Sequence, residues 1–343
     1  MQQTPATFFT WWRAFRFHFI PPSFLPAMLG GVLAWAITGQ FNALFYFLTV
    51  LGVTLNHIAL NMTDDYFDYI ASVDRAKDRE KNPYSGGSGT LTSGLIQPGQ
   101  MRTFFTLAYI LTVVIGIYLS IAQSYWIFVF GLFGMMSAYF YTAPPIRYGY
   151  HGFGEVSQLV NFSFTIGIGA YVAQTVSFSW EAFWVVLPLG FMMFAMITIN
   201  EIPDLKDDKA GGKNNLVVLF GAETAARLYG ISMIAAFFII LFAPVFGLAS
   251  FWIYLSLITF PWFIRALKIL YQNYTNPVKL APANLLTIRI HNLVGILLIL
   301  AYIIQGFQNQ HDIWQMVVPV VTLVVFYTPV AFPVFFMSSR KSN

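Results

Sequence analysis

The sequence predicts an all-α, polytopic membrane protein, a bundle of about nine to ten transmembrane helices. Two observations support this prediction. Of the 343 residues, 57% are hydrophobic and only 9% are charged, and the mean hydropathy is +0.66. The apolar residues also gather in runs of about 20, the length that a helix needs to cross the hydrocarbon core of a bilayer.

Ten segments are long and apolar enough to be spans. In chain order they are residues 22–38, 42–62, 101–121, 124–142, 154–176, 181–200, 221–245, 249–271, 287–307 and 314–337. Proline cannot continue an α-helix, so Pro203 is expected to end or kink the sixth span and let residues 204–208 begin a separate short turn. The N-terminus lacks a short apolar run followed by a small-residue cleavage site, so no cleaved signal is expected.

The basic residues predict the orientation in the membrane. All 18 Lys and Arg lie in the N-terminal segment, in the C-terminal tail, or at or near the connections after spans two, four, six and eight. The alternate connections are short and carry only Glu181, His311 and Asp312. Because basic residues concentrate in cytoplasmic loops, both termini and the acidic loops are expected on the cytoplasmic side of a cell (inner) membrane.

The composition also excludes several classes of function. The chain has no Cys, which excludes disulfides, thiolate metal sites and cysteine nucleophiles. The net charge of +4 follows from the basic loops, and no basic run is dense enough to indicate nucleic acid. Residues 1–343 are therefore expected to form one membrane domain with no appended soluble module.

Two acidic clusters, at residues 61–78 and 200–213, each lie where an apolar run ends. Three residues of each cluster stand at relative positions 0, 3 and 7: Asn61, Asp64 and Asp68 in the first set, and Glu201, Asp204 and Asp208 in the second. This spacing places each set on one face of a helix. Solvated loops would explain the charges but not the shared spacing, which also indicates two pseudo-repeat halves.

Carboxylates at the edge of a membrane indicate a functional site, because their desolvation is costly unless a cation offsets it. Oxygen ligands without Cys or a pair of His favour Mg²⁺, which binds through one or two carboxylates and substrate phosphate oxygens. We therefore expect two Mg²⁺ ions, one at each cluster, that together hold a diphosphate.

Several neighbouring residues could each have either a structural or a functional role. His57 lies on the helical face of Asn61 and either packs in the bundle or contacts substrate. Arg147, Lys209 and Lys213 either hold a diphosphate or mark the cytoplasmic side of the membrane. The glycine-rich stretch 82–89 either presents backbone N–H groups to phosphate or only permits tight turns.

These residues resemble the motifs of the UbiA superfamily of intramembrane aromatic prenyltransferases, most closely its menaquinone branch, which acts on 1,4-dihydroxy-2-naphthoate. The first family motif is Asn-Asp-x-x-Asp with a later Asp, and the chain is similar to it at Asp64, Asp65, Asp68 and Asp74, with Asp64 in place of the usual Asn. The second motif is similar at Asp204, Asp208, Gly212, Lys213 and Leu216. The resemblance covers nearly the whole chain, although Pro203 stands where many members carry Arg.

The resemblance implies a central cavity capped by cytoplasmic loops. There a polyprenyl diphosphate loses pyrophosphate, and its allylic cation alkylates an aromatic acceptor. Four residues are implied as catalytic Mg²⁺ ligands, with Asp65 and Asp74 in support: Asp64, Asp68, Asp204 and Asp208. The implied substrate contacts are His57, Asn61, Tyr141, Arg147, Asn200, Glu201, Lys209 and Lys213.

Other activities stay open at this stage. Within the family the acceptor could be 4-hydroxybenzoate, a tocopherol-type ring, a chlorophyllide or a glyceryl phosphate ether lipid. A divalent-cation transporter would also need membrane acids, but near the bilayer midplane in interrupted helices rather than at cytoplasmic helix ends. An intramembrane aspartyl protease would need two lone aspartates within spans, a pattern that fits the clusters poorly.

Overall fold

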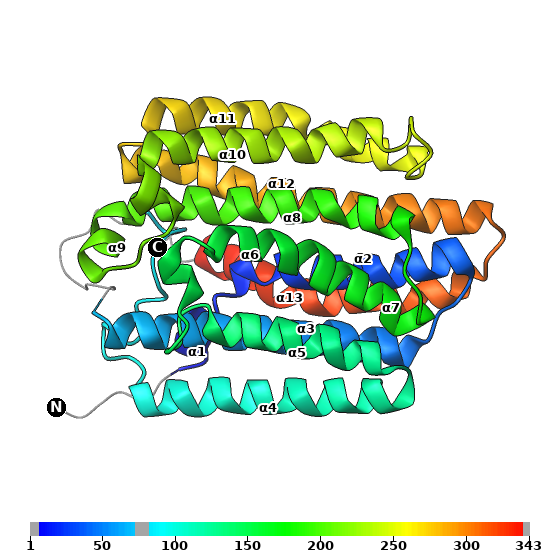
Figure 1. Cartoon of the computed structure of the whole chain (residues 1–343), viewed down its shortest axis with the longest axis horizontal. Helices are drawn as coiled ribbons and strands as arrows, with labels where there is room; N and C mark the ends of the chain where they lie inside the picture. The colour runs from blue at the N-terminus through cyan, green and yellow to red at the C-terminus, as the bar shows by residue number, and fades with distance from the viewer. Residues whose placement is uncertain (1–6, 73–81, 339–343) are drawn as a thin grey trace.

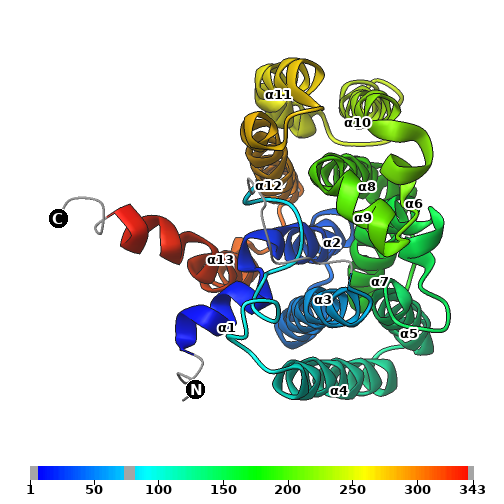
Figure 2. The same ribbon diagram turned by 90° about the vertical axis from the view of Figure 1, so that its left-hand side faces the viewer.

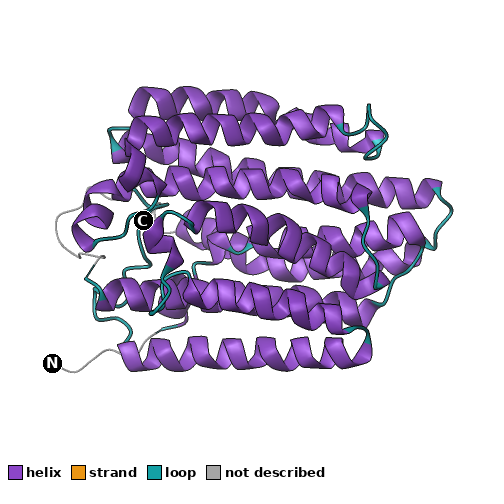
Figure 3. Ribbon diagram, in the orientation of Figure 1, coloured by secondary structure: helices purple, strands orange, loops and turns teal. Residues whose placement is uncertain are grey.

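The computed structural model describes residues 7–72 and 82–338, with side chains up to residue 330. Within these ranges the chain consists of helices and loops, without strands (Figure 3). Nine of the described helical segments are long and apolar enough to cross a membrane, and a further apolar helix, α5 (Tyr125–Phe140), is shorter. The predicted all-α bundle of about nine to ten spans is therefore confirmed.

Each predicted span corresponds to one helical segment. The spans other than α5 are α2 (Pro21–Thr38), α3 (Ala43–Ile70), α4 (Pro98–Ala122), the continuous α6 (Gly154–Val160), η3 (Asn161–Ile168) and α7 (Gly169–Thr175), α8 (Trp180–Glu201), α10 (Leu216–Phe242), η5 (Phe251–Thr259) with α11 (Phe260–Asn273), α12 (Pro277–Gln308), and η6 (Ile313–Met316) with α13 (Val317–Ser338). The remaining short elements are α1 (Phe8–Phe15), η1 (Phe17–Phe19), η2 (Tyr148–His151), η4 (Ile202–Asp204) and α9 (Leu205–Gly211).

Two helices extend beyond the predicted boundaries. α3 continues to Ile70, past the predicted end at residue 62, so the first acidic set lies inside the helix. α12 begins at Pro277 instead of residue 287, where the Asn276 side chain accepts a hydrogen bond from the N–H of Lys279. An Asn cap followed by Pro is a favoured helix start. Apolar run length alone missed both ends because polar residues continue these helices.

α2 lies at the centre of the bundle, surrounded by the other spans (Figure 2). Of its residues, 89% are buried, and Trp35 is completely covered. A Cβ atom at Gly30 would overlap the carbonyl oxygen of Gly167, so the absence of a side chain lets α2 approach η3 closely. This tight packing makes α2 the buried central helix of the bundle.

The loops divide between the two ends of the bundle. α9, η2 and α1 lie together at one end, and the connection from α12 to α13, with Asp312, lies at the other (Figure 1). The two acidic sets are at the first end, where α3 and α8 finish. This arrangement agrees with the segregation of basic and acidic connections in the sequence, whereas the pseudo-repeat halves stay a prediction.

Candidate active site

Both acidic sets line one cavity of about 110 Å³ at the α9 end of the bundle. Its walls come from α3, α6, η3, α8, α9, the segment after α1 and the loop at residues 84–87. Its polar residues are Arg16, His57, Asn61, Asp64, Asp68, Ser85, Gln158, Asn200, Glu201, Asp204, Asp208 and Lys213. The inner part is apolar and includes Phe19, Leu60, Phe162, Met193 and Met196. The cavity thus combines a charged mouth with an apolar interior.

The first acidic set faces the cavity because α3 is regular through residue 70. Asn61, Asp64 and Asp68 recur at three and four residues, so their side chains lie on one helical face. Asp68 is 5% exposed and accepts a hydrogen bond from the Tyr150 hydroxyl at 2.6 Å. The amide of Asn61 donates to the Phe15 carbonyl oxygen at 3.2 Å, which ties α3 to α1.

The second acidic set keeps its common face although the helix is interrupted. α8 ends at Glu201, Pro203 lies in the 3-10 turn η4, and α9 begins at Leu205. This agrees with the break expected at Pro203. The other two members of the set, Asp204 and Asp208, still reach the cavity. Asp208 is 6% exposed and accepts a hydrogen bond from the Asn215 amide at 2.8 Å.

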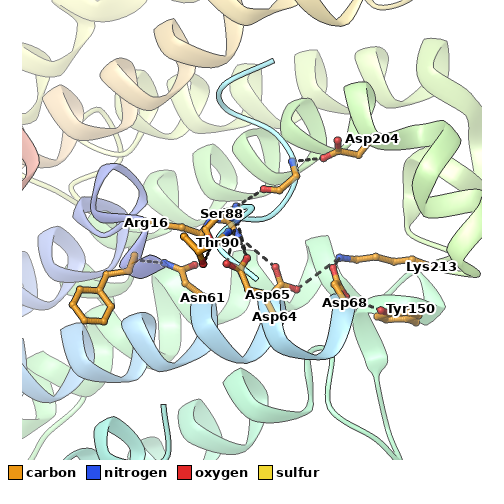
Figure 4. A network of polar contacts seen from close by, with 12 residues as sticks. Arg16, Asn61, Asp64, Asp65, Asp68, Ser88, Thr90, Tyr150, Asp204 and Lys213 are labelled. Atoms are coloured by element: carbon orange, nitrogen blue, oxygen red, sulfur yellow. Dashed lines mark hydrogen bonds and ion pairs between the residues drawn. The ribbon is translucent and has the colours of Figure 1, made fainter. Parts of the chain in front are cut away.

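A glycine-rich loop connects the two acidic clusters. The N–H of Gly86 donates to Asp204 at 2.6 Å, and the N–H of Ser88 donates to both oxygens of Asp65, at 3.0 and 3.1 Å (Figure 4). Asp65 does not line the cavity and is turned toward this loop. The described backbone donors of the loop therefore hold carboxylates in place, and their use as a phosphate cradle stays a prediction.

Two cations lie against the first acidic set. The Lys213 ammonium is 2.9 Å from Asp68 and 3.7 Å from Asp64. The Arg16 guanidinium is 3.4 Å from Asp64 and 3.7 Å from Asp65, and it donates to the Gly86 carbonyl oxygen at 3.2 Å (Figure 4). The cavity thus presents carboxylates and donors together, as a metal–diphosphate complex requires.

Lys213 is held in its charged form. Burial lowers the pKa of the Lys213 ammonium, but the carboxylates of Asp68, Asp64 and Asp208 raise it more, and the net pKa lies well above its usual value. Burial, followed by the charge of Asp68, raises the pKa of Tyr150, which therefore remains a hydroxyl donor. Both groups keep their protons at neutral pH, so Lys213 is a permanent cation at the mouth.

The remaining predicted contacts fall into two groups. His57, Tyr141, Asn200 and Glu201 line the cavity. The Nδ1 atom of His57 is 2.8 Å from the Ser23 hydroxyl, so its ring is fixed by packing as well as placed at the cavity. Lys209 is exposed on α9 and Arg147 packs over the Tyr150 ring, and neither lines the cavity.

Asp74 and Asp78 lie outside the described residues, so the predicted support from Asp74 stays a prediction.

Sequence reasoning missed three residues at the site. Arg16 and Tyr150 contact the first acidic set directly. Glu155 is fully buried, and its carboxylate accepts the N–H of Leu216 at 2.6 Å, which anchors the start of α10 beside Lys213. All three lie in the part of the chain that the family resemblance covers, which was the available signal. Their contacts depend on tertiary packing, which spacing along one helix does not show.

The four aspartates at the cavity are suitable ligands for Mg²⁺. Asp64, Asp68, Asp204 and Asp208 offer only oxygen ligands to the same cavity. Among the residues that the structure describes, no three acidic or histidine side chains converge closely enough to form a complete metal site. An ion at either set would therefore need further oxygens, and a diphosphate bound between the sets offers them.

Comparison with known proteins gives one consistent result. The model of the UbiA prenyltransferase family matches residues 23–293. A Bacillus subtilis protein named 1,4-dihydroxy-2-naphthoate octaprenyltransferase is 25% identical over 297 residues, which cover 87% of this chain and 93% of that protein. A Synechocystis protein named 2-carboxy-1,4-naphthoquinone phytyltransferase is 22% identical over 298 residues, covering 87% of this chain and 94% of that protein.

Solved structures give the same fold. A UbiA homolog from Aeropyrum pernix superposes with a TM-score of 0.61 at 14% identity, covering 82% of this chain and 97% of that one. A UbiA homolog from Archaeoglobus fulgidus, bound to DMAPP and Mg²⁺, superposes with a TM-score of 0.54 at 14% identity, covering 84% and 99%. The resemblance that the motifs indicated is therefore confirmed over most of the chain.

Proposed function

Because this chain belongs to the UbiA prenyltransferase family, we propose that it transfers a polyprenyl group from its diphosphate to 1,4-dihydroxy-2-naphthoate, a step of menaquinone biosynthesis. The observation that carries the proposal is the convergence of both acidic sets, Lys213 and Arg16 on one cavity whose inner part is apolar. The two naphthoate relatives, each matched over more than 90% of its length, support this acceptor.

The residues of the cavity suit the two ends of the donor. Lys213 and Arg16 are placed to donate hydrogen bonds to a diphosphate at the mouth. When bound between the acidic sets, Mg²⁺ would offset the charge of the diphosphate and stabilise the departing pyrophosphate. We expect two ions, because the cavity has two acidic sets.

The apolar interior suits the prenyl chain and its cation. Phe19 and Phe162 line this part, and aromatic faces stabilise an allylic cation while the walls exclude water that would quench it. The electron-rich acceptor ring then bonds to the terminal prenyl carbon. In the naphthoate case the ring regains aromaticity by losing its carboxyl group as carbon dioxide. The prenyl group bonds to the ring carbon that carries the carboxylate, the electron pair of the broken carbon–carboxylate bond returns to the ring as carbon dioxide leaves, and the pyrophosphate of the donor is the other product.

Product analysis tests this proposal. Purified protein with Mg²⁺, labelled polyprenyl diphosphate and 1,4-dihydroxy-2-naphthoate should release pyrophosphate and form a prenylated, decarboxylated naphthoquinol, identified by mass. Parallel reactions contain 4-hydroxybenzoate, a tocopherol-type ring, a chlorophyllide or a glyceryl phosphate ether lipid. Turnover with only one of these would reassign the acceptor. Membership in a prenyltransferase family argues against the alternative function of a divalent-cation transporter. Metal uptake without any prenylated product would favour the transporter over the prenyltransferase.

Substitution of Lys213 tests its proposed contact with the diphosphate. Lys213→Met should lower kcat/KM for the donor by roughly 30-fold, about 2 kcal/mol, because a buried charge-assisted contact is lost. Lys209→Met, four residues away on the exposed surface of α9, is the matched control and should change kcat/KM less than twofold. Equal losses in the two variants would contradict a specific role for Lys213.

A second pair of variants tests whether Asp64 and Asp68 are the principal ligands of the first acidic set, or Asn61 and Asp65 instead. Asp64→Asn keeps an oxygen toward the cavity and should stay within about tenfold of wild-type turnover, about 1.4 kcal/mol. Asp65→Asn should be equally mild, since its remaining oxygen still accepts the Ser88 N–H. Steady-state kinetics provide the measurement. A severe loss in Asp64→Asn, combined with normal turnover in Asp68→Asn, would mean that this assignment of ligands is wrong.

In the proposed orientation the protein lies in the cell (inner) membrane. Both termini and the active-site loops are on the cytoplasmic side. A cysteine replacing Lys209 should react with a membrane-impermeant thiol reagent only from the cytoplasmic side. One replacing Asp312 should react only from the other side, because these residues lie at opposite ends of the bundle (Figure 1). The native chain has no Cys, so no background reaction occurs. Labelling of both positions from the same side would contradict the ten-span topology.

A further inference from the structure

A second pocket lies outside the active-site cavity, between α3, α4 and α5. Its volume is about 810 Å³. α4 is at the edge of the bundle (Figure 2), and only 17% of its most apolar stretch is buried, so the pocket is on the face that lipid covers in a membrane. Much of its lining is hydrocarbon: Ile70, Ile110, Val113, Val114, Met135 and Met136. We call this feature the α3–α4–α5 pocket.

Aromatic side chains from all three helices give this pocket a fixed shape. Five rings form a closed circuit in which each contacts the next, in the order Tyr66, Phe67, Tyr139, Tyr109 and Phe105. The separations between ring centroids are 5.2 to 6.4 Å. Edge-to-face contacts of this kind orient rings that have few rotatable bonds. The pocket is therefore a preformed feature of the wall.

Among the described residues that line the pocket, Arg102 is the one with a charged side chain. It lies near the start of α4, at the end of the bundle that carries the acidic sets (Figure 1). Arg102 is exposed and forms no ion pair with a described carboxylate. A guanidinium at the membrane edge pairs well with phosphate, since its N–H groups match two phosphate oxygens.

The pocket shares helix α3 with the active site. Asp64 and Asp68 face the catalytic cavity, whereas Tyr66 and Phe67 on the same turns face the α3–α4–α5 pocket. Thr63, fully buried beside Asp64, donates a hydrogen bond to the Tyr109 hydroxyl at 3.3 Å. Whatever fills the pocket therefore packs against the reverse side of the turns that hold the first acidic set.

We propose that the α3–α4–α5 pocket binds one anionic phospholipid from the surrounding bilayer. Its phosphate pairs with Arg102, and an acyl chain lies along Ile110, Val113 and Val114. The pocket complements an amphiphile, because its walls are hydrocarbon and its one charged lining residue among those described is a cation at the membrane edge. A zwitterionic lipid fits less well, because its choline group adds a positive charge near Arg102.

Lipid titration of the purified full-length protein tests this proposal without any enzyme assay. Native mass spectrometry counts bound phosphatidylglycerol or phosphatidylcholine with identical acyl chains. Wild type should bind one phosphatidylglycerol at least about fivefold more tightly than phosphatidylcholine, as expected for one basic contact near the membrane surface. Arg102→Gln should abolish the preference. Val113→Trp should weaken binding of both lipids by filling the pocket.

Arg265→Gln is the matched control, because Arg265 is an exposed arginine on α11 that does not line the pocket, and it should keep the preference. Melting temperatures in detergent micelles without added lipid show whether each variant is folded. Equal affinity for both lipids in wild type, or a preference retained in Arg102→Gln, would overturn the proposal. Loss of the preference in Arg265→Gln would also overturn it. Displacement of phosphatidylglycerol by a polyprenyl diphosphate analogue, dependent on Arg102, would assign the pocket to the donor instead.

Discussion

Replacement of Asp68 or Asp208 with alanine should lower turnover by about 100-fold or more in each case, on the order of 3 kcal/mol in the activation barrier. Both carboxylates are almost fully buried at the same cavity. Asp68→Ala also leaves the Lys213 ammonium without its 2.9 Å partner. Initial rates of pyrophosphate release, with donor and acceptor both saturating, are the measurement.

Asp207→Ala is the control that makes this prediction specific. Asp207 precedes Asp208 on α9 but does not line the cavity, so its substitution should cost far less turnover. Melting temperatures of all three variants separate loss of chemistry from loss of fold. If Asp207→Ala is as damaging as Asp208→Ala, the acidic α9 turn acts through its overall charge, and the proposed ligand positions are wrong.

Periodicity in the sequence predicted that each acidic set shares one helical face, and the resemblance implied the central cavity that all six members line. The first set required only that α3 remain helical through Asp68, which helical spacing implies. The second set also required that Pro203 interrupt the helix without turning Asp208 away. The interruption is a single three-residue 3-10 turn, η4, and Asp208 in α9 still lines the cavity.

The choice between Lys209 and Lys213 could not be made from spacing. Gly212 has a φ of 75°, a left-handed conformation that ends α9 and reverses the chain. Lys213 therefore returns to the cavity, while Lys209 stays on the outer face of α9. The Gly-Lys pair at the end of a helix was the available signal. The direction in which the Lys213 side chain points depends on where Tyr150 and Asp68 lie in the folded chain. Contacts between distant segments decide the positions of these two residues.

Removal of divalent metal should abolish turnover, and Mg²⁺ or Mn²⁺ should restore it. The cavity carries the carboxylates of both acidic sets, and a bound diphosphate adds further negative charge. Lys213 and Arg16 already pair with Asp64, Asp65 and Asp68, so these two cations cannot also neutralise the diphosphate fully. Like-charge repulsion would then exclude the donor from the site.

Two measurements follow from this argument. Pyrophosphate release in excess chelator should fall to background, and full turnover there would contradict the metal-dependent mechanism. Metal content, measured by emission spectroscopy with an unreactive donor analogue bound, should be two ions per chain in wild type. It should fall in Asp208→Ala but not in Asp207→Ala. Since no three described ligands converge without substrate, omission of the analogue should leave little metal bound. A full complement of metal without the analogue would show that the protein alone completes the sites.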